Sequence, residues 1–541
     1  MRWLRVCFLV LTPGLLLAQT TQNSAPSVAD DLKALREAIA QQQQQIAQQQ
    51  QQMAQQQAEI DKLQKSLDEK TAGNPHVENA ALHTTAPVTA ATVATDMQEP
   101  PKESPLSFRI GAADFTPGGF VDFENIFRTT NTGNVSATSF GAIPFSNTVQ
   151  GHLTEYRSTG QYSRYNLTVT TKFGANNVKG YIEGDFNGTD PANVFVTSNS
   201  HTNRLRLYWL DLKRGKWEFL GGQTWGLQTP NRTGVSPNPA DLSLGFQEDA
   251  GIGVGYNYTR AAEFRAAYHF NDNFVWAWAI QNPQQFVGAG AVIFPFAFNA
   301  QLGTQFDNTA VPGAPNMTPD FLTKFAYDHT GGHHLHFELG GVLTTVKATV
   351  LPIGGTTFNG HSMVGGGVNT AFLADITKNF RFVAQGMWGY GIGRYLNGLA
   401  PDVVVRPVQT GATTFDANLS GVHSGNFVGG FEIQPHPKVQ LAAYYGGMFA
   451  GRNAFQDVTS PLVVKPFIGF GGLNSPNSAN RAIQQGTFDW TQTFWRNPQY
   501  GAVLLVTQYS YLTRSPWFVA AGAPKNAHLF MSFVSLRYVL P

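Results

Sequence analysis

The sequence predicts an all-β protein, a 16-stranded antiparallel transmembrane β-barrel preceded by an N-terminal coiled-coil helix. From residue 106 onward, segments of about ten residues alternate apolar and polar side chains, as membrane strands do when one face meets lipid and the other meets water. The connections between these segments are alternately short and long, which is typical of bacterial barrels. The chain also begins with the pattern of a secretory signal peptide.

Composition favours one large β-architecture. Only 13% of the 541 residues are charged, about half the roughly 25% found in soluble globular domains. The mean hydropathy of -0.18 indicates dispersed apolar residues, and no apolar run after the N-terminus approaches the roughly 20 residues of a membrane-spanning helix. A helical membrane protein is therefore excluded. The net charge of +1 excludes a polybasic nucleic-acid binder, which needs a surplus of Lys and Arg.

Residues 1–18 have the three parts of a signal peptide. Arg2 and Arg5 precede an apolar core at residues 6–17, and a small residue ends the segment. A buried N-terminal helix is the alternative, which a Pro-Gly pair inside the core disfavours. Cys7 is the only cysteine and lies in this segment, so the mature chain has no thiol for disulfides, zinc-thiolate sites or cysteine nucleophiles.

Residues 30–70 predict a periplasmic coiled coil. Apolar residues occupy every seventh position there, namely Leu32, Ile39, Ile46, Met53, Ile60 and Leu67. The other core position is Gln in the middle heptads, and a disordered Gln-rich tract is the alternative. Residues 71–105, rich in Thr, Ala, Pro and Asn, are expected to form a flexible linker. The barrel is expected over residues 106–541.

The expected barrel strands have alternating side chains and are separated by turn residues. They are residues 117–128, 161–173, 178–187, 203–213, 216–226, 262–270, 273–281, 319–328, 334–347, 361–376, 380–392, 424–434, 438–450, 486–495, 500–512 and 527–540. A soluble β-sandwich also alternates, but an even strand count with regularly alternating loop lengths favours the barrel. Both barrel ends are then expected at the periplasmic side.

With these segments in place, the chain resembles the DcaP-like porins, a family of trimeric outer-membrane channels with an N-terminal coiled coil before a 16-stranded barrel. The resemblance is carried by the order of the segments and by short motifs, which are Gly180-Tyr181-Ile182-Glu183-Gly184-Asp185-Phe186, Arg204-Leu205-Arg206, Gly222-Gln223-Thr224-Trp225 and Gln281-Asn282-Pro283. It implies passive uptake of small solutes, with a preference for anions such as dicarboxylates.

The long connection at residues 227–261 follows the fifth expected strand. In porins generally, the loop in this place folds into the lumen and narrows it, and the alternative is a loop that stays outside. Its candidate constriction residues are Arg232, Asp241, Glu248, Asp249, Tyr256, Tyr258 and Arg260.

Strand alternation turns charged side chains of both signs toward the lumen. The arginines are Arg164, Arg204, Arg206, Arg265 and Arg381, and the carboxylates are Asp122, Glu124, Glu183, Asp185 and Glu263. Rings of charge set pore selectivity, and a guanidinium suits a carboxylate solute because it donates two parallel hydrogen bonds. Arg204 and Arg206 form the best basic ladder. The alternative is that these arginines pair with lumen carboxylates and support the wall.

Other chemistry is less favoured. His334, His336 and Glu338 alternate onto one strand face and could hold a metal, but near a short turn they are better interpreted as lumen polar groups. The aromatic residues Trp217, Phe219, Phe274, Trp276, Trp278, Trp388 and Trp490 are expected to face outward, in interfacial girdles or between protomers. No catalytic or cofactor-binding motif occurs in a convincing context, so we expect no enzyme and no cofactor.

The expected function is that of an outer-membrane porin for passive diffusion of small polar or anionic solutes. The expected partners are two further copies of the chain in a homotrimer, outer-membrane lipid and the solutes, with no nucleic acid. The alternatives are a structural tether, in which the coiled coil links envelope layers, and a hydrolase carried on a barrel.

Overall fold

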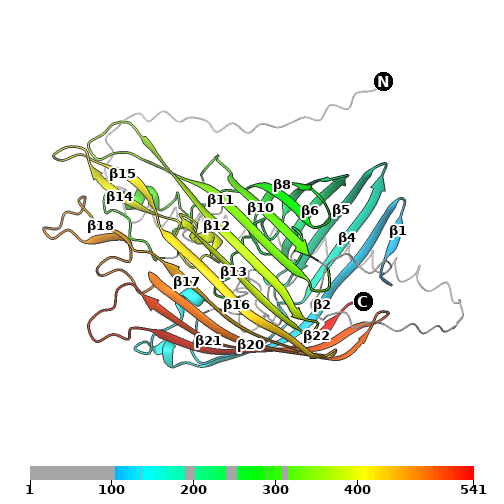
Figure 1. Ribbon diagram of the computed structural model, residues 1–541. Coiled ribbons are helices and arrows are strands. Elements are labelled where there is room, and N and C mark those ends of the chain that lie inside the picture. Colours follow the sequence, from blue (N-terminus) through cyan, green and yellow to red (C-terminus); the bar gives the residue numbers. More distant parts are fainter. Residues whose placement is uncertain are drawn as a thin grey trace, which may run out of the picture. The chain divides into compact units, whose positions relative to one another are not determined.

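The computed structural model describes residues 104–133, 136–188, 201–238, 253–288, 290–306, 315–329 and 331–541. The predicted signal peptide, the coiled coil and nearly all of the linker lie outside the described residues, and they remain predictions. The described residues form a β-barrel (Figure 1).

The barrel wall is one antiparallel sheet that closes on itself. The first wall strand, β2 (Ala113–Arg128), pairs along one edge with the last strand, β22 (Ala527–Val539), and along its other edge with β3 (Glu155–Thr159) and β4 (Arg164–Phe173). The sheet has 18 strands, of which β1 (Phe108–Ile110) is a short addition to β2. Because β3 and β4 are two parts of one wall strand, sixteen strands make the wall, as predicted.

The remaining wall strands follow in chain order, each paired with the next. They are β5 (Asn176–Asp185), β6 (Arg204–Arg214), β7 (Trp217–Gln223), β8 (Ala262–His269), β9 (Phe274–Gln281), β10 (Asp320–His329), β11 (Leu335–Val350), β12 (Asn359–Thr377), β13 (Phe380–Tyr390), β16 (His423–His436), β17 (Val439–Ala450), β20 (Asn480–Asn497) and β21 (Gly501–Pro516). Each of the sixteen segments expected from the alternation overlaps one wall strand.

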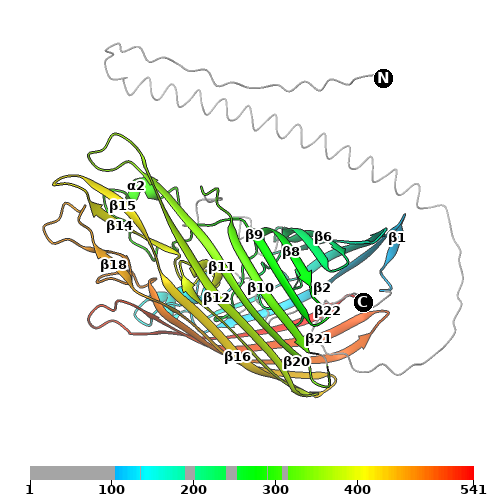
Figure 2. The same ribbon diagram turned by 45° about the horizontal axis from the view of Figure 1, so that its top comes forward.

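Two further hairpins and short helical turns lie in the long connections, where alternation predicted no strands. They are β14 (Val403–Gln409) with β15 (Phe415–Gly421), β18 (Asn453–Gln456) with β19 (Phe467–Phe470), α2 (Asn299–Leu302), η1 (Phe140–Ala142), η2 (Val149–His152) and η3 (Gly393–Tyr395). Figure 2 shows α2 at the same barrel end as β14 and β15. Among the described residues, none of the helices is long and apolar enough to cross a membrane.

Short turns occupy the opposite end of the barrel. Gly174 and Gly215 have φ angles of 57° and 58°, a left-handed conformation that glycine adopts without steric cost, and each reverses the chain between adjacent wall strands. Bacterial barrels place such turns in the periplasm and long loops outside. The C-terminus lies at the turn end (Figure 1), in agreement with the expected orientation.

Exposure along the wall is the reverse of that in a soluble protein. Large apolar side chains such as Leu343 and Phe427 point outward and are 58% and 50% exposed, whereas Lys324 and Glu338 point inward and are buried. Exposing such a large apolar surface to water is energetically unfavourable, so the outer face requires lipid around it.

At the loop end, the barrel interior is apolar. Inward-facing Leu512, Leu529 and Met531 pack with Ile143 and with Phe470 from two long connections. The external connections are therefore packed into the mouth of the barrel.

The outward apolar band predicts a position-specific cost of charge. Phe427→Arg places a guanidinium in hydrocarbon and should lower the free energy of unfolding in lipid vesicles by about 2–4 kcal/mol. Phe358→Arg is the matched control, because Phe358 is 72% exposed in the connection before β12 and its replacement should change stability by less than about 0.5 kcal/mol. Equal effects in urea titrations would show that Phe427 does not face lipid.

Candidate constriction in the barrel lumen

The described part of the connection between β7 and β8 runs inside the barrel. Its described residues, 224–238 and 253–261, are here called the lumen segment. It begins where Glu263 of β8 accepts hydrogen bonds from Thr224 Oγ1 at 2.7 Å and from the Leu227 backbone N–H at 3.2 Å. It then reaches β10, where the inward Lys324 ammonium donates to the Thr229 carbonyl at 2.7 Å. The described residues of the range 227–261 thus lie inside the barrel, whereas 239–252 lie outside the described residues.

Arg232 holds the lumen segment to the distant strand β16. Its guanidinium donates two hydrogen bonds to the Glu432 carboxylate, at 2.6 and 2.8 Å, and both side chains are buried. Burial opposes the charge of Arg232, but the facing carboxylate outweighs this and raises the guanidinium pKa above its usual value. Tyr444 also donates to Glu432, at 2.8 Å. This buried, bidentate pair is the strongest kind of charge-assisted contact.

After Arg232 the chain returns along the inner wall. The Gly234 N–H donates to Asp328 of β10 at 2.9 Å, Arg265 of β8 donates to the Val235 carbonyl at 2.8 Å, and Trp209 of β6 donates to Asn238 Oδ1 at 2.9 Å. The lumen segment is therefore fastened to the wall at several strands.

The second part of the lumen segment lies against the opposite side of the wall. The Val254 N–H donates to Gln485 of β20 at 2.7 Å, and Gln385 of β13 donates to the Gly255 carbonyl at 2.8 Å. Gly255 has a φ of 106°, and a Cβ there would overlap the Phe427 backbone carbonyl of β16. Only glycine permits this close approach of two backbones.

Apolar side chains inside the wall explain why the segment enters. Tyr181, Leu207, Trp209 and Leu220 face inward and pack with Trp225. Strands β8 to β10 also present inward apolar residues, which pack with Leu227 and Val235, namely Ala267, Val275, Ala277, Ala279, Leu322 and Ala326. Lumen walls are usually polar, so apolar residues on both faces of these strands were a signal in the sequence that a loop covers them.

The predicted arginine ladder is part of an ion-pair cluster, here called the arginine cluster. Arg204 donates to Asp185 at 2.6 and 3.0 Å. Arg206 pairs with Glu183 and lies 3.5 Å from Asp185, and Arg164 lies 3.8 Å from Glu183. Among the described residues, three guanidinium groups thus contact two carboxylates. The Arg164 and Arg204 side chains are 21% and 25% exposed, whereas that of Arg206 is 3% exposed.

Trp225 links this cluster to the lumen segment. The Arg206 and Arg260 guanidinium carbons lie 4.6 and 5.7 Å from the Trp225 ring centroid, within cation–π range. Tyr258 packs on the same ring with centroids 5.2 Å apart. Arg260 thereby adds a further cation beside the arginine cluster.

Several other predicted lumen charges are also paired. Arg265 donates to Glu263 at 2.5 Å, and Arg381 donates to Asp375 at 2.5 Å and lies 3.9 Å from Glu432. A separate pair joins Asp122 and Arg537 at 2.7 Å. Tyr256 is buried against β16 and β17, and Glu124 is buried in β2. Asp241, Glu248 and Asp249 lie outside the described residues.

The histidine group belongs to an ion network. His336 contacts Asp328 at 2.8 Å and Glu338 at 3.1 Å, and Glu338 pairs with Lys324 at 2.9 Å. Glu338 also accepts from the Asn231 N–H of the lumen segment at 2.9 Å. Within the described part of the chain, no group of three or more His, Cys, Asp or Glu side chains is arranged to hold a metal ion.

A second connection, residues 391–402, also enters the lumen and was not expected to do so. Its residues Arg394, Tyr395 and Asp402 form a buried group with Asp320 of β10, here called the Arg394 latch. Arg394 and Tyr395 both donate to Asp320, and the Asp402 carboxylate accepts from the Arg394 N–H at 2.9 Å. The Tyr258 N–H donates to the Tyr395 carbonyl at 3.1 Å, so the two inward segments support each other.

Several solved structures have a fold similar to that of this barrel. It is similar to the outer-membrane channel DcaP of Acinetobacter baumannii, with a TM-score of 0.52 and 14% identity, over 80% of this chain and 99% of that chain. It also matches OprB of Pseudomonas putida (TM-score 0.43, 9% identity, 78% of this chain and 94% of that chain) and OmpF of Salmonella typhi (0.41, 10%, 80% and 100%). No family model and no curated protein sequence matches the chain.

The fold is that of a 16-stranded outer-membrane porin barrel, and the likeness to the DcaP channel confirms at the level of fold the resemblance seen in the sequence.

The Arg394 latch predicts a pH-dependent contribution to stability. Burial raises the pKa of the Asp402 carboxyl from 3.8 to about 6, against the lowering effect of Arg394. Because the folded state binds this proton more tightly than the unfolded chain, the Asp402 contribution to the free energy of unfolding decreases from about pH 4 to about pH 6 and is constant above. The total change is about 3 kcal/mol.

Asp402→Asn should remove this slope, which urea titrations of both proteins in detergent at about pH 4, 5, 6 and 7 would measure. Asp416→Asn is the control, because hydrogen bonds lower the pKa of Asp416 against a burial effect and its contribution has the opposite sign. Parallel pH profiles for wild type and Asp402→Asn would contradict the prediction.

Proposed function

We propose that the protein is an outer-membrane channel for passive diffusion of small polar or anionic solutes, narrowed by the connection at residues 227–261. The observation that carries the proposal is the lumen segment, which is fastened across the barrel from Glu263 to Glu432 and Gln485. A segment so fixed divides the lumen and leaves a narrower passage. No catalytic step is part of the proposal.

The arginine cluster supports a preference for anions. Its three guanidinium groups and the neighbouring Arg260 place four cationic side chains at this position, which favours anionic over cationic solutes. Arg164 and Arg204 are partly exposed and are the groups that a solute carboxylate would meet, whereas the buried Arg206 supports the wall. Two guanidinium groups suit two carboxylates, so dicarboxylates remain the proposed solute class.

We propose that three copies associate through their barrels. The support is an outward polar patch where β2 meets β3. Asn125 Oδ1 accepts hydrogen bonds from Tyr156 and Ser158, both at 2.8 Å, on the same face as the exposed Phe123. Polar side chains facing hydrocarbon are costly, so contact between protein copies suits this surface better than lipid.

Removing the arginines tests the channel and its selectivity together. Arg204→Ala/Arg206→Ala removes two of the three guanidinium groups that contact Glu183 and Asp185, so the net charge of the cluster becomes more negative by two. In planar bilayers under a salt gradient, we expect conductance in three equal steps for wild type, with an anion-selective reversal potential that moves toward cation selectivity in the variant.

The control is Arg204→Gln/Asp185→Asn, which removes one ion pair and leaves the net charge of the cluster unchanged, so the reversal potential should stay near that of wild type. A folded, heat-modifiable barrel without conductance would reject the channel. Conductance with an unchanged reversal potential in the double alanine variant would reject the arginine cluster as the selectivity site.

Releasing the lumen segment tests the constriction. Arg232→Met removes its bidentate pair with Glu432 and should give larger and noisier single-channel conductance, because the segment loses its anchor on β16. Arg109→Met makes the same change in a pair with Asp114 that is largely exposed at the turn end, and it should leave conductance unchanged. Equal conductance for wild type and Arg232→Met would show that the segment does not limit flow.

A further inference from the structure

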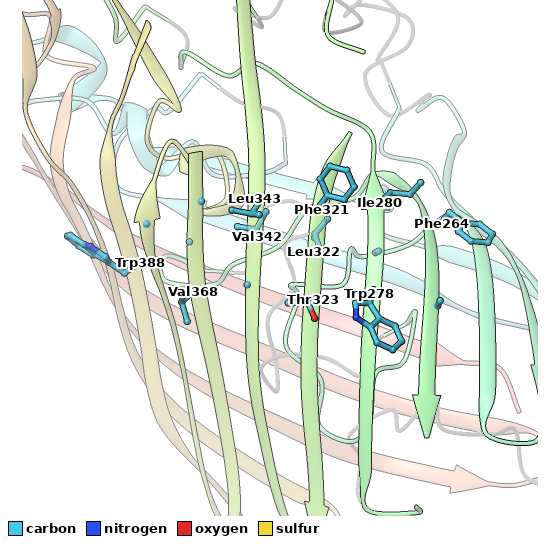
Figure 3. A pocket seen from close by; sticks show the side chains of 16 residues that line it. Phe264, Trp278, Ile280, Phe321, Leu322, Thr323, Val342, Leu343, Val368 and Trp388 are labelled. Carbon is cyan, nitrogen blue, oxygen red and sulfur yellow. The ribbon is translucent and has the colours of Figure 1, made fainter. Parts of the chain in front are cut away.

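The outer face of the barrel carries an apolar groove across strands β8 to β13 (Figure 3). Its volume is about 770 Å³. Its lining side chains come from six neighbouring strands, and the largest are Phe264, Trp278, Phe321, Leu343 and Trp388. They are the outward members of their strands, so the groove faces the membrane and not the lumen.

Small residues on two strands create the groove. On β11, Gly341 lies between the outward positions of Leu339 and Leu343, and on β10 its cross-strand partner Thr323 lies between those of Phe321 and Phe325. A row of small residues is thus bordered on both sides by large ones. The backbone is uncovered at Gly341, and an apolar chain can approach it closely.

The one hydroxyl group that lines the groove has its hydrogen bonds within the protein. Thr323 accepts a hydrogen bond from Trp276 Nε1 at 2.9 Å and donates to the Ala277 carbonyl at 3.2 Å. Trp278 and Val368 flank this row, and their apolar surfaces form its sides (Figure 3). An occupant would gain dispersion contacts and would not need hydrogen bonds.

An aromatic array on the turn side of the groove argues for lipid as the occupant. Tyr268, Trp276 and Phe325 are outward cross-strand neighbours. The Trp276 ring lies 4.1 Å from that of Trp278 and 5.0 Å from that of Phe325. Aromatic girdles mark the membrane interface of barrels, so the groove continues the lipid-facing band. It differs in this from the polar patch around Asn125.

We infer that this groove is a binding site for an acyl chain of an outer-membrane lipid, held between Trp278 and Trp388 over the uncovered backbone of Gly341. The site does not depend on conduction through the lumen. At this groove the barrel binds one acyl chain specifically. The rest of its apolar outer surface contacts lipid molecules that exchange freely.

Gly341 allows the site to be filled by substitution. A Cβ added there meets its nearest neighbours, the Gly367 carbonyl and Thr323 Cγ2, at 3.7 Å, which is ordinary van der Waals contact. Gly341→Leu would therefore occupy the groove without displacing the backbone. Gly486→Leu is the matched control, because Gly486 lies between Gln484 and Phe488 on an outward position of β20 and has open space around its Cβ.

The test is native mass spectrometry of the full-length protein, stripped of lipid and then mixed with phosphatidylethanolamine bearing 16-carbon chains. We expect one lipid adduct per chain in wild type and Gly486→Leu, and its loss in Gly341→Leu. The folded state of each variant is checked by heat-modifiable electrophoresis. Should Gly341→Leu fail to fold, Val368→Phe narrows the same groove from the next strand and should also lose the adduct.

Three results would overturn the inference. Equal adducts in wild type and the groove variants would show that lipid binds elsewhere. Loss of the adduct in Gly486→Leu as well would indicate lipid that is not specific to the groove. A changed oligomer mass in Gly341→Leu with the adduct retained would identify the groove as a contact between protein copies.

Discussion

Closure of the sheet between β2 and β22 is the constraint on which the rest of the structure depends. In hydrocarbon, every backbone N–H and C=O group must be bonded within the protein, and a sheet achieves this only when it has no free edge. Closure also separates two environments for side chains. Outward side chains such as Phe427 contact lipid. Inward charged side chains such as Lys324 are buried in the barrel interior, where each charge needs a partner of opposite sign.

The interior meets this need by pairing charges across neighbouring strands and with the lumen segment. Arg232 with Glu432 is the clearest case, because one buried pair both satisfies two charges and fixes a connection on the far side of the barrel. The arginine cluster differs, since two of its three guanidinium groups, Arg164 and Arg204, are partly exposed. Under the proposed function, their charge acts on solutes in the lumen.

The outer face of the barrel also has regions of different chemistry. The polar patch of Asn125, Tyr156 and Ser158 suits contact with protein. The groove at Gly341 is lined mainly by apolar surfaces, and its one hydroxyl group, that of Thr323, is hydrogen-bonded within the protein, so the groove suits hydrocarbon. Inside the barrel, the Arg394 latch and the lumen segment meet at Tyr258 and Tyr395.

The sequence by itself determined the strands and the direction of their side chains, because a period of two and turn residues such as Gly174 act locally. It thereby placed Arg164, Arg204 and Arg206 in the lumen. Only the tertiary structure decided their partners and the course of the connections. Arg232 meets Glu432 200 residues along the chain, and Arg394 meets Asp320 across the lumen. Such contacts exist only after the barrel closes, since closure is what brings distant strands to one interior.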